Sequence, residues 1–149
     1  MARGQIYMFE KFAGQMGDGD YDFPNDSWKL AMIDNTSPPS VDDTDITWAT
    51  IDANEVSGSG YTAGGESLTS VTWTYNTTLD RWEFKAADVS WGITVSGPTD
   101  CYYGVLVNTT TGDCAVFIDM GGPVSLEADD IDFEWDADGI FWHKPNASA

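Results

Sequence analysis

The single histidine of the chain, His143, is the residue that any Ser-His-Asp or Cys-His catalytic site would have to use. It stands between Trp142 and Lys144, and the sequence contains no G-x-S-x-G nucleophile motif. Glycoside hydrolysis needs two opposed carboxylates, and spacing singles out no such pair among the 25 Asp and Glu residues. We therefore interpret His143 as a surface or partly packed side chain and predict that the protein is not an enzyme.

An acidic stretch resembles the first half of a calcium-binding EF-hand loop, with Asp18, Asp20 and Asp22 at alternate positions. However, Phe23 stands where that loop needs glycine, and Lys29 stands where it needs a bidentate glutamate. One histidine and two distant cysteines also do not make a standard zinc site. We predict no metal and no cofactor, with an ordered Ca²⁺ ion on the acidic loops as the alternative.

The two cysteines, Cys101 and Cys114, fall on two β-like runs joined by a short polar turn. If the turn centres on the threonines between the runs, Cys114 faces Val107, about six residues along the ladder from Cys101, or roughly 20 Å. A disulfide requires Cα atoms within about 7 Å. We therefore predict two free thiols, which suits a reducing compartment.

The charge of the chain is strongly acidic, with six Lys and Arg against 25 Asp and Glu and a net charge of −19. This balance argues against free nucleic acid and anionic membranes as partners, because both are bound through cationic side chains. It favours solubility before assembly, docking on a basic patch, or Ca²⁺ binding. No run reaches the ~18–20 apolar residues of a membrane span, and the N-terminal segment lacks the apolar core of a signal peptide. We expect synthesis in a cytoplasm.

One helix is predicted, over residues 5–17. Its apolar side chains recur at spacings of three, four and seven, and Gly17 follows as a C-cap. The stripe consists of Ile6, Phe9, Phe12, Ala13 and Met16. Because so short a helix is marginal alone, the stripe must dock, either on the chain's own sheet or on a neighbouring subunit.

Short alternating runs separated by Gly, Pro, Asn and Asp turns predict roughly eight to ten strands. They cover residues 27–34, 68–75, 81–85, 89–91, 93–95, 102–107, 115–120, 131–135 and 140–142, with a helical turn or short strand at 48–51. Gly121-Gly122-Pro123 is predicted to break the chain, and Asp138-Gly139 to form a hairpin. Irregular loops are expected at 18–26 and 35–47, and a flexible tail at 144–149.

These elements predict a mainly β fold over residues 1–149, a single-domain antiparallel β-sandwich or jelly-roll-like barrel with one short N-terminal helix. The stretch NEVSGSGYTAGG (residues 54–65) holds four glycines around Tyr61, which we expect to pin the loop by packing. A nucleotide-binding role is rejected, because no lysine follows the glycines and the stretch lacks a strand-then-helix context.

Several stretches stand out for their glycine turns and strand cores. They are NEVSGSGYTAGGESL (Asn54–Leu68), ADVSW (Ala87–Trp91), SGPTD followed by YYGVLVN (Ser96–Asn108), AVFIDMGG (Ala115–Gly122) and FEWDADGIF (Phe133–Phe141). In this order they resemble a group of small virion proteins of tailed bacteriophages. The likeness extends from about Gln5 to Phe141 and includes the N-terminal helix and SWKLAMID, while the HKPNASA ending and the loop at 17–22 do not match.

The resemblance implies a structural protein of a phage particle, made in the bacterial host cytoplasm. Such proteins resemble capsid decoration (cement) proteins, which bind the major capsid protein or other virion proteins, often as trimers or dimers. The alternatives are a tail, baseplate or head-fibre component, or a carbohydrate- or Ca²⁺-binding β module. Aromatic and methionine side chains dominate interface energetics. The candidate interface residues are Ile6, Phe9, Phe12, Met16, Tyr21, Phe23 and Trp48.

Overall fold

The computed structural model describes residues 4–144, which form ten strands, two α-helices and one 3₁₀ helix. Most elements are short and are separated by turns, as the sequence predicts. In chain order they are β1 (Gln5–Met8), α1 (Glu10–Asp18), β2 (Trp28–Ile33), α2 (Trp48–Ile51), η1 (Asp52–Asn54), β3 (Glu66–Ser67), β4 (Thr72–Asn76), β5 (Arg81–Lys85), β6 (Val89–Trp91), β7 (Cys101–Asn108), β8 (Cys114–Val124), β9 (Ile131–Phe133) and β10 (Phe141–His143).

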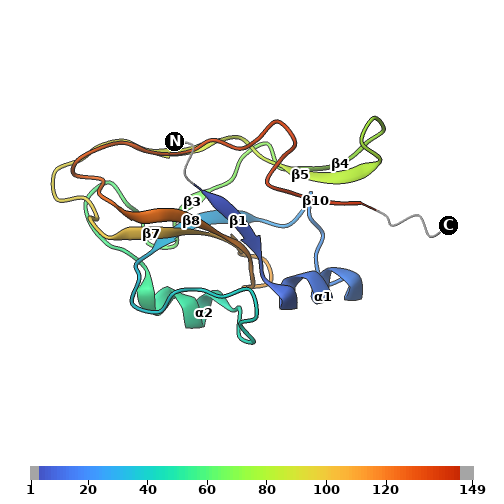
Figure 1. The fold of residues 1–149 in the computed structure, drawn as a ribbon, viewed down its shortest axis with the longest axis horizontal. Helices are drawn as coiled ribbons and strands as arrows, with labels where there is room; N and C mark the ends of the chain where they lie inside the picture. The colour runs from blue at the N-terminus through green and yellow to red at the C-terminus, as the bar shows by residue number, and fades with distance from the viewer. Residues whose placement is uncertain (1–3, 145–149) are drawn as a thin grey trace.

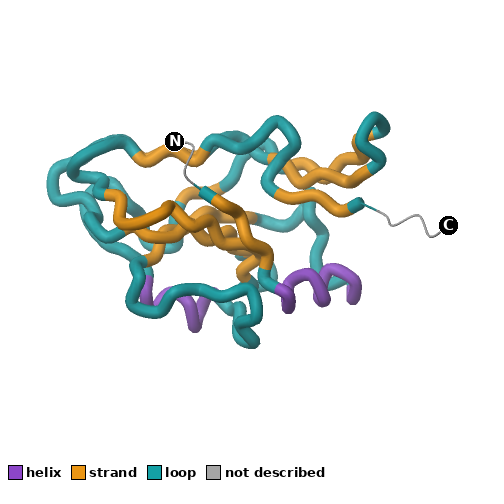
Figure 2. Tube along the Cα trace, in the orientation of Figure 1, coloured by secondary structure: helices purple, strands orange, loops and turns teal. Residues whose placement is uncertain are grey.

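The strands form three antiparallel sheets, which confirms the predicted mainly β, sandwich-like class. The largest sheet has the order β1-β8-β7-β2-β3, a smaller one has the order β10-β5-β4, and β6 pairs with β9. Both α-helices lie on the same side of the five-stranded sheet, and the three-stranded sheet projects at one end of the molecule (Figures 1 and 2). The buried apolar side chains form one connected cluster.

An aromatic cluster joins the two larger sheets to α1. Phe84 of β5 stacks on Phe141 of β10 with ring centroids 4.7 Å apart, and Trp28 of β2 meets Phe84 edge-on at 4.9 Å. Phe12 of α1 lies 6.0 Å from Phe141, and Phe23 lies 5.8 Å from Phe84. Each buried ring covers roughly 150–250 Å². This cluster therefore fixes the three-stranded sheet against the helix and the main sheet.

The β7–β8 hairpin confirms the predicted register, since Val107 pairs with Cys114. Both cysteines are buried and free. Burial, with a smaller contribution from the Asp100 carboxylate, raises the pKa of Cys101 to about 12. Burial likewise raises the pKa of Cys114. The thiolate is the reactive form, so both thiols are held in their inert state.

The helix predicted over 5–17 is wrong in its first turn. Residues Gln5–Met8 form strand β1, which pairs with Val116–Asp119 of β8, and α1 begins only at Glu10. The reason is non-local, because the edge of β8 offers hydrogen bonds that a helical first turn would not satisfy. The C-cap is Gly19, with φ 83°, and not Gly17.

Three further predictions fail where pairing depends on distant strands. Strand β8 continues through Gly121-Gly122-Pro123 to Val124, which pairs with Cys101 beyond a register shift. Gly139 N–H donates to Asp136 O in the expected turn, but β9 pairs with β6 and β10 with β5, so no hairpin forms. Residues 93–95 form no strand, and Val95 is 87% exposed. At 48–51 the helical alternative is the one observed. Most of the predicted tail lies outside the described residues.

Tyr61 holds the glycine-rich loop against the main sheet, through hydrogen bonds as well as packing. Its hydroxyl donates to Glu55 Oε1 at 2.7 Å and accepts from the Met32 backbone N–H at 3.0 Å. The same Glu55 oxygen accepts from the Gly64 N–H at 2.6 Å. The ring lies 5.9 Å from that of Trp91. Burial, followed by the Glu55 contacts, raises the pKa of Tyr61.

We expect Tyr61→Phe to lower the free energy of unfolding by about 1–3 kcal/mol, because it leaves the Met32 N–H without its acceptor. Equilibrium urea unfolding measures the change. Tyr75→Phe is the matched control, because the Tyr75 hydroxyl donates a hydrogen bond to Asp80 at an exposed position. Equal urea midpoints for the two variants would contradict the assigned role of Tyr61.

Candidate functional site

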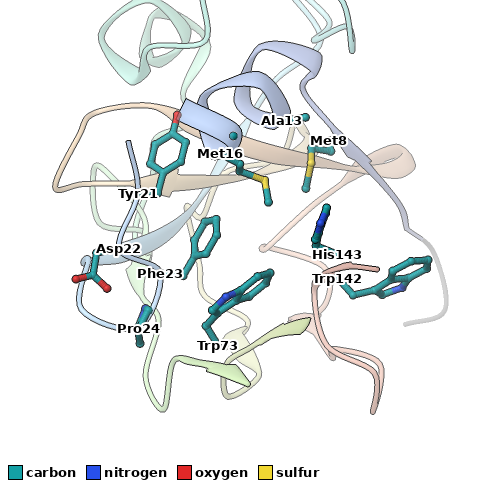
Figure 3. A pocket seen from close by; sticks show the side chains of 11 residues that line it. Met8, Ala13, Met16, Tyr21, Asp22, Phe23, Pro24, Trp73, Trp142 and His143 are labelled. Atoms are coloured by element: carbon teal, nitrogen blue, oxygen red, sulfur yellow. The ribbon is translucent and has the colours of Figure 1, made fainter. Parts of the chain in front are cut away.

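An open apolar groove separates α1 from the three-stranded sheet (Figure 3). Its volume is about 650 Å³. The apolar lining comprises Met8, Ala13, Met16, Phe23, Pro24 and Trp73, and the polar lining includes Tyr21, Asp22 and His143. The sulfur ends of Met8 and Met16 point into the groove, opposite Phe23, Trp73 and His143 (Figure 3). Flexible methionine side chains suit a surface that adapts to a partner.

Aromatic side chains continue from the groove along one face of the three-stranded sheet. Trp73 of β4 lies 4.7 Å from buried Phe23 and stacks on Trp82 of β5 at 5.9 Å with an interplanar angle of 18°. Tyr75 follows at 5.6 Å from Trp82. Trp82 is 39% exposed and Tyr75 44% exposed. The aromatic surface therefore extends from the core to solvent across the edge of the groove.

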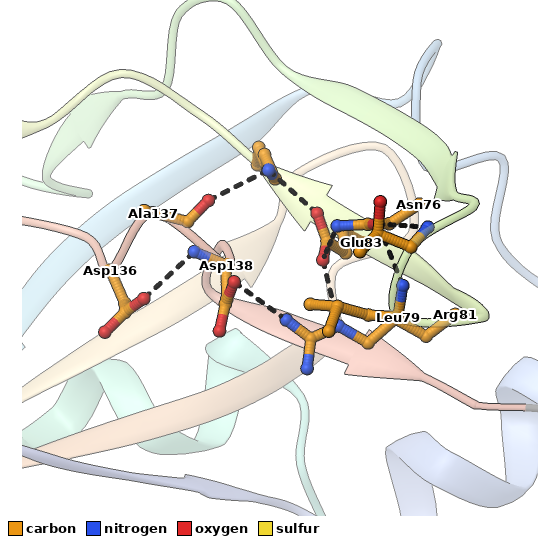
Figure 4. A network of polar contacts seen from close by, with 9 residues as sticks. Asn76, Leu79, Arg81, Glu83, Asp136, Ala137 and Asp138 are labelled. Atoms are coloured by element: carbon orange, nitrogen blue, oxygen red, sulfur yellow. Dashed lines mark hydrogen bonds and ion pairs between the residues drawn. The ribbon is translucent and has the colours of Figure 1, made fainter.

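The reverse face of this sheet carries a compact ionic network (Figure 4). Glu83 is 2% exposed and lies between two cations, with Arg81 Nε 2.9 Å from Oε1 and Lys85 Nζ 2.8 Å from Oε2. Asn76 donates to Glu83 Oε1 at 2.9 Å, and Arg81 also pairs with Asp138 at 3.0 Å. The carboxylate thereby has partners for both oxygens, which burial requires.

Arg81 also lies over the ring of Trp142, 4.8 Å from its centroid. This cation–π contact covers part of Trp142, which nevertheless remains 51% exposed. The indole of Trp142 projects away from the groove centre, so this residue borders the groove while its ring belongs to the reverse face (Figure 3). The ionic network thus stiffens the sheet that carries one wall of the groove.

The network makes the stability of the folded protein depend on pH. Hydrogen bonds from Lys85, then Arg81 and Asn76, outweigh burial and lower the pKa of Glu83 to about 2 from an ordinary value near 4.5. A folded-state pKa below the unfolded one stabilises the fold above about pH 4.5. That contribution is lost as the pH falls from about 4.5 towards 2.

We therefore expect Glu83→Gln to lower the melting temperature at pH 7. The difference in melting temperature between the variant and the parent protein should be smaller at pH 3. Thermal unfolding followed by circular dichroism at both values measures the difference. Glu66→Gln, at an exposed position on β3, is the matched control and should leave the melting temperature near that of the parent. A gap for Glu83→Gln that is the same at both pH values would contradict the assignment.

Three of the predicted interface residues are core residues of this chain. Phe9 and Phe12 are fully buried, and Phe23 is 8% exposed. The part of the predicted helix stripe that is buried, Phe9 and Phe12, therefore docks on the chain's own sheets, which is one of the two alternatives that the sequence left open. Phe9 and Phe12 offer no accessible surface to a partner, whereas Phe23 forms the floor of the groove.

The other four predicted interface residues keep some exposed surface. Met16 and Tyr21 line the groove, while Ile6 on β1 and Trp48 on α2 lie outside it. The Tyr21 hydroxyl lies 3.0 Å from Gln15 Oε1 and 3.1 Å from Asp113 Oδ2, so the ring is fixed in place. Burial, then the Asp113 carboxylate, raises the pKa of Tyr21. Contact of these four residues with a partner stays a prediction.

The residues weighed for catalysis or metal binding are placed as follows. His143 is exposed on β10 at the groove. Asp22 is exposed, and its two oxygens accept from Asn25 Nδ2 at 3.0 Å each. Across residues 4–144, no three His, Cys, Asp or Glu side chains are grouped so that they could hold a metal ion. No helix within that same span is long and apolar enough to cross a membrane.

Comparison with known proteins adds no relative. The sequence matches no family model, no curated protein and no solved structure. The likeness to phage virion proteins therefore stays a prediction from sequence.

Sequence reasoning found one wall of the groove and missed the other. The helix spacing pointed to Met16, and the aromatic loop pointed to Tyr21 and Phe23. The sequence predicts only that Trp73 lies on a strand and that His143 lies next to the tail, because the β4–β5–β10 pairing that brings them to the groove is not local. The alternation of aromatic residues in 73–84 was the available signal.

Proposed function

We propose that this chain is a non-enzymatic structural protein of a tailed-phage particle, in the first place a capsid decoration protein on the outer head surface that stabilises contacts between capsomers. The sequence resemblance motivates the proposal. The observation that carries it is the open groove with its exposed aromatic margin, since solvent-facing methionine and tryptophan side chains are typical of surfaces that a partner covers.

The remaining architecture suits an assembled part. Short antiparallel strands, tied together by the aromatic cluster and the Glu83 network, give a compact body that presents surfaces to its neighbours. The net charge of −19 supports solubility before assembly and complements basic patches on a shell. The major capsid protein is the proposed partner, and a homotrimer or homodimer is the proposed oligomer.

Copy number in purified particles tests the proposal. Quantitative mass spectrometry of virions should find this chain in numbers near those of the shell protein. Six or twelve copies would overturn the decoration role and favour a tail, baseplate or head-fibre position. Absence from the particles would overturn any structural role in the virion.

A further inference from the structure

The groove has three kinds of lining. Met16 of α1 and Met8 of β1 supply flexible apolar surface, Trp73 of β4 supplies an aromatic ring, and Asp22 and His143 lie among the polar lining. A volume of about 650 Å³ is enough for a few side chains of an incoming segment. No part of residues 4–144 fills it.

Charge decides which occupant fits. The groove lining includes one carboxylate, that of Asp22, and, among the described residues, no lysine or arginine. Asp18, the last residue of α1, and Asp20, which follows the Gly19 cap, are exposed but do not line the groove, while Lys144 is the cation that follows His143. A second copy of the chain would bring a further net charge of −19 to a protein that already carries −19 and to a lining with a carboxylate and no lysine or arginine, so it is the poorer occupant.

We propose that the groove binds an extended peptide segment of another protein in which a lysine or arginine lies beside an apolar side chain. The apolar side chain would pack between Met8, Met16 and Phe23. The cation would lie near Asp22 or over the ring of Trp73. The identity of that protein as a particle component rests on the proposed function, whereas the chemistry of the site does not.

Methyl NMR of methionine-labelled protein tests the site directly. Met8 and Met16 line the groove, whereas Met32 and Met120 are buried elsewhere, at 0% and 1% exposure, and act as internal controls. The probes are an alternating arginine–leucine hexapeptide, an alternating glutamate–leucine hexapeptide and cellohexaose. We expect the arginine–leucine peptide to shift the Met8 and Met16 signals, with binding that weakens between about 0.05 M and about 0.5 M salt.

Two substitutions assign the binding to the groove. Ala13→Trp fills it from the exposed side of α1 and should abolish the Met8 and Met16 shifts, whereas Ala49→Trp on α2 should preserve them. Asp22→Asn should weaken peptide binding about two- to five-fold, and Asp132→Asn, at the exposed position of β9, should not. The Ala13→Trp result is interpreted only if the Met32 and Met120 signals of that variant match those of the parent, which shows that it is folded. Asp22→Asn provides a test with a smaller structural change.

Equal shifts with both peptides would overturn the charge preference. Shifts with cellohexaose alone would overturn the peptide in favour of a sugar ligand, and unchanged Met8 and Met16 signals would overturn the site. These outcomes are separate from that of the particle measurement. If the protein is abundant in virions but its groove does not bind the arginine–leucine peptide, the proposed function stands and this inference is overturned.

Discussion

Replacing Phe12 with alanine is expected to lower the free energy of unfolding by about 3–5 kcal/mol. The side chain is fully buried, and its ring lies 4.5 Å from Tyr21, 6.0 Å from Phe141 and 6.4 Å from Trp28. Truncation leaves a cavity where α1 meets two sheets. Because whole domains have only about 5–15 kcal/mol of stability, the variant should be marginal.

Equilibrium urea unfolding, followed by tryptophan fluorescence and circular dichroism, measures the effect of Phe12→Ala. Val95→Ala is the control, because it also removes apolar atoms but at a position that is 87% exposed, and it should stay within about 0.5 kcal/mol of the parent. A loss for Phe12→Ala no larger than that of the control would show that α1 does not rely on this ring.

The second large effect is expected for Gly65→Ala, immediately before β3. Gly65 has φ 80°, and an added Cβ would overlap the Leu30 carbonyl and lie 2.6 Å from Ala31 Cα. Left-handed backbone costs an alanine about 1–2 kcal/mol and overpacking costs about 1–3 kcal/mol. We therefore expect a loss of about 2–5 kcal/mol, because both obstacles are backbone of β2 and cannot rotate away.

Gly14→Ala provides the matched control for Gly65→Ala. Gly14 lies within α1, and a Cβ built there meets nothing within 4 Å. The same substitution should therefore stabilise the protein, by about 0.5–1 kcal/mol. Urea midpoints that move in opposite directions are the expected result. A midpoint for Gly65→Ala at or above that of the parent would contradict the close approach of β3 to β2.

The sequence was most informative where structure is local. Alternation placed β2, β5 and β7 within a residue or two, and the turn before Cys114 gave its pairing with Val107. It failed where partners are distant, as at β1, because no local pattern reveals that residues 5–8 complete the edge of β8. The separation of β9 from β10 escaped detection for the same reason.

The candidate site shows the same division. Met16, Tyr21 and Phe23 come from one continuous stretch, in which the helical apolar spacing points to Met16 and the aromatic residues of the following loop are Tyr21 and Phe23. Trp73 and His143 belong to strands β4 and β10, which are both paired with β5. The sequence shows which residue types these are but does not predict that they lie close together. The apolar pattern also does not distinguish buried from accessible residues, because Phe12 belongs to the same stripe as Met16 but is fully buried.

The pairing of β1 with β8, and of β10 with β5, bears on how the polypeptide matures on the ribosome. Met8 meets Val116, so the first strand emerges long before its partner has been translated. The β4–β5 hairpin similarly waits for Phe141 to cover Phe84. The nascent chain therefore exposes an unpaired strand edge and an aromatic face until its C-terminal strands have been synthesised. During this period it is most prone to aggregation and most dependent on chaperones.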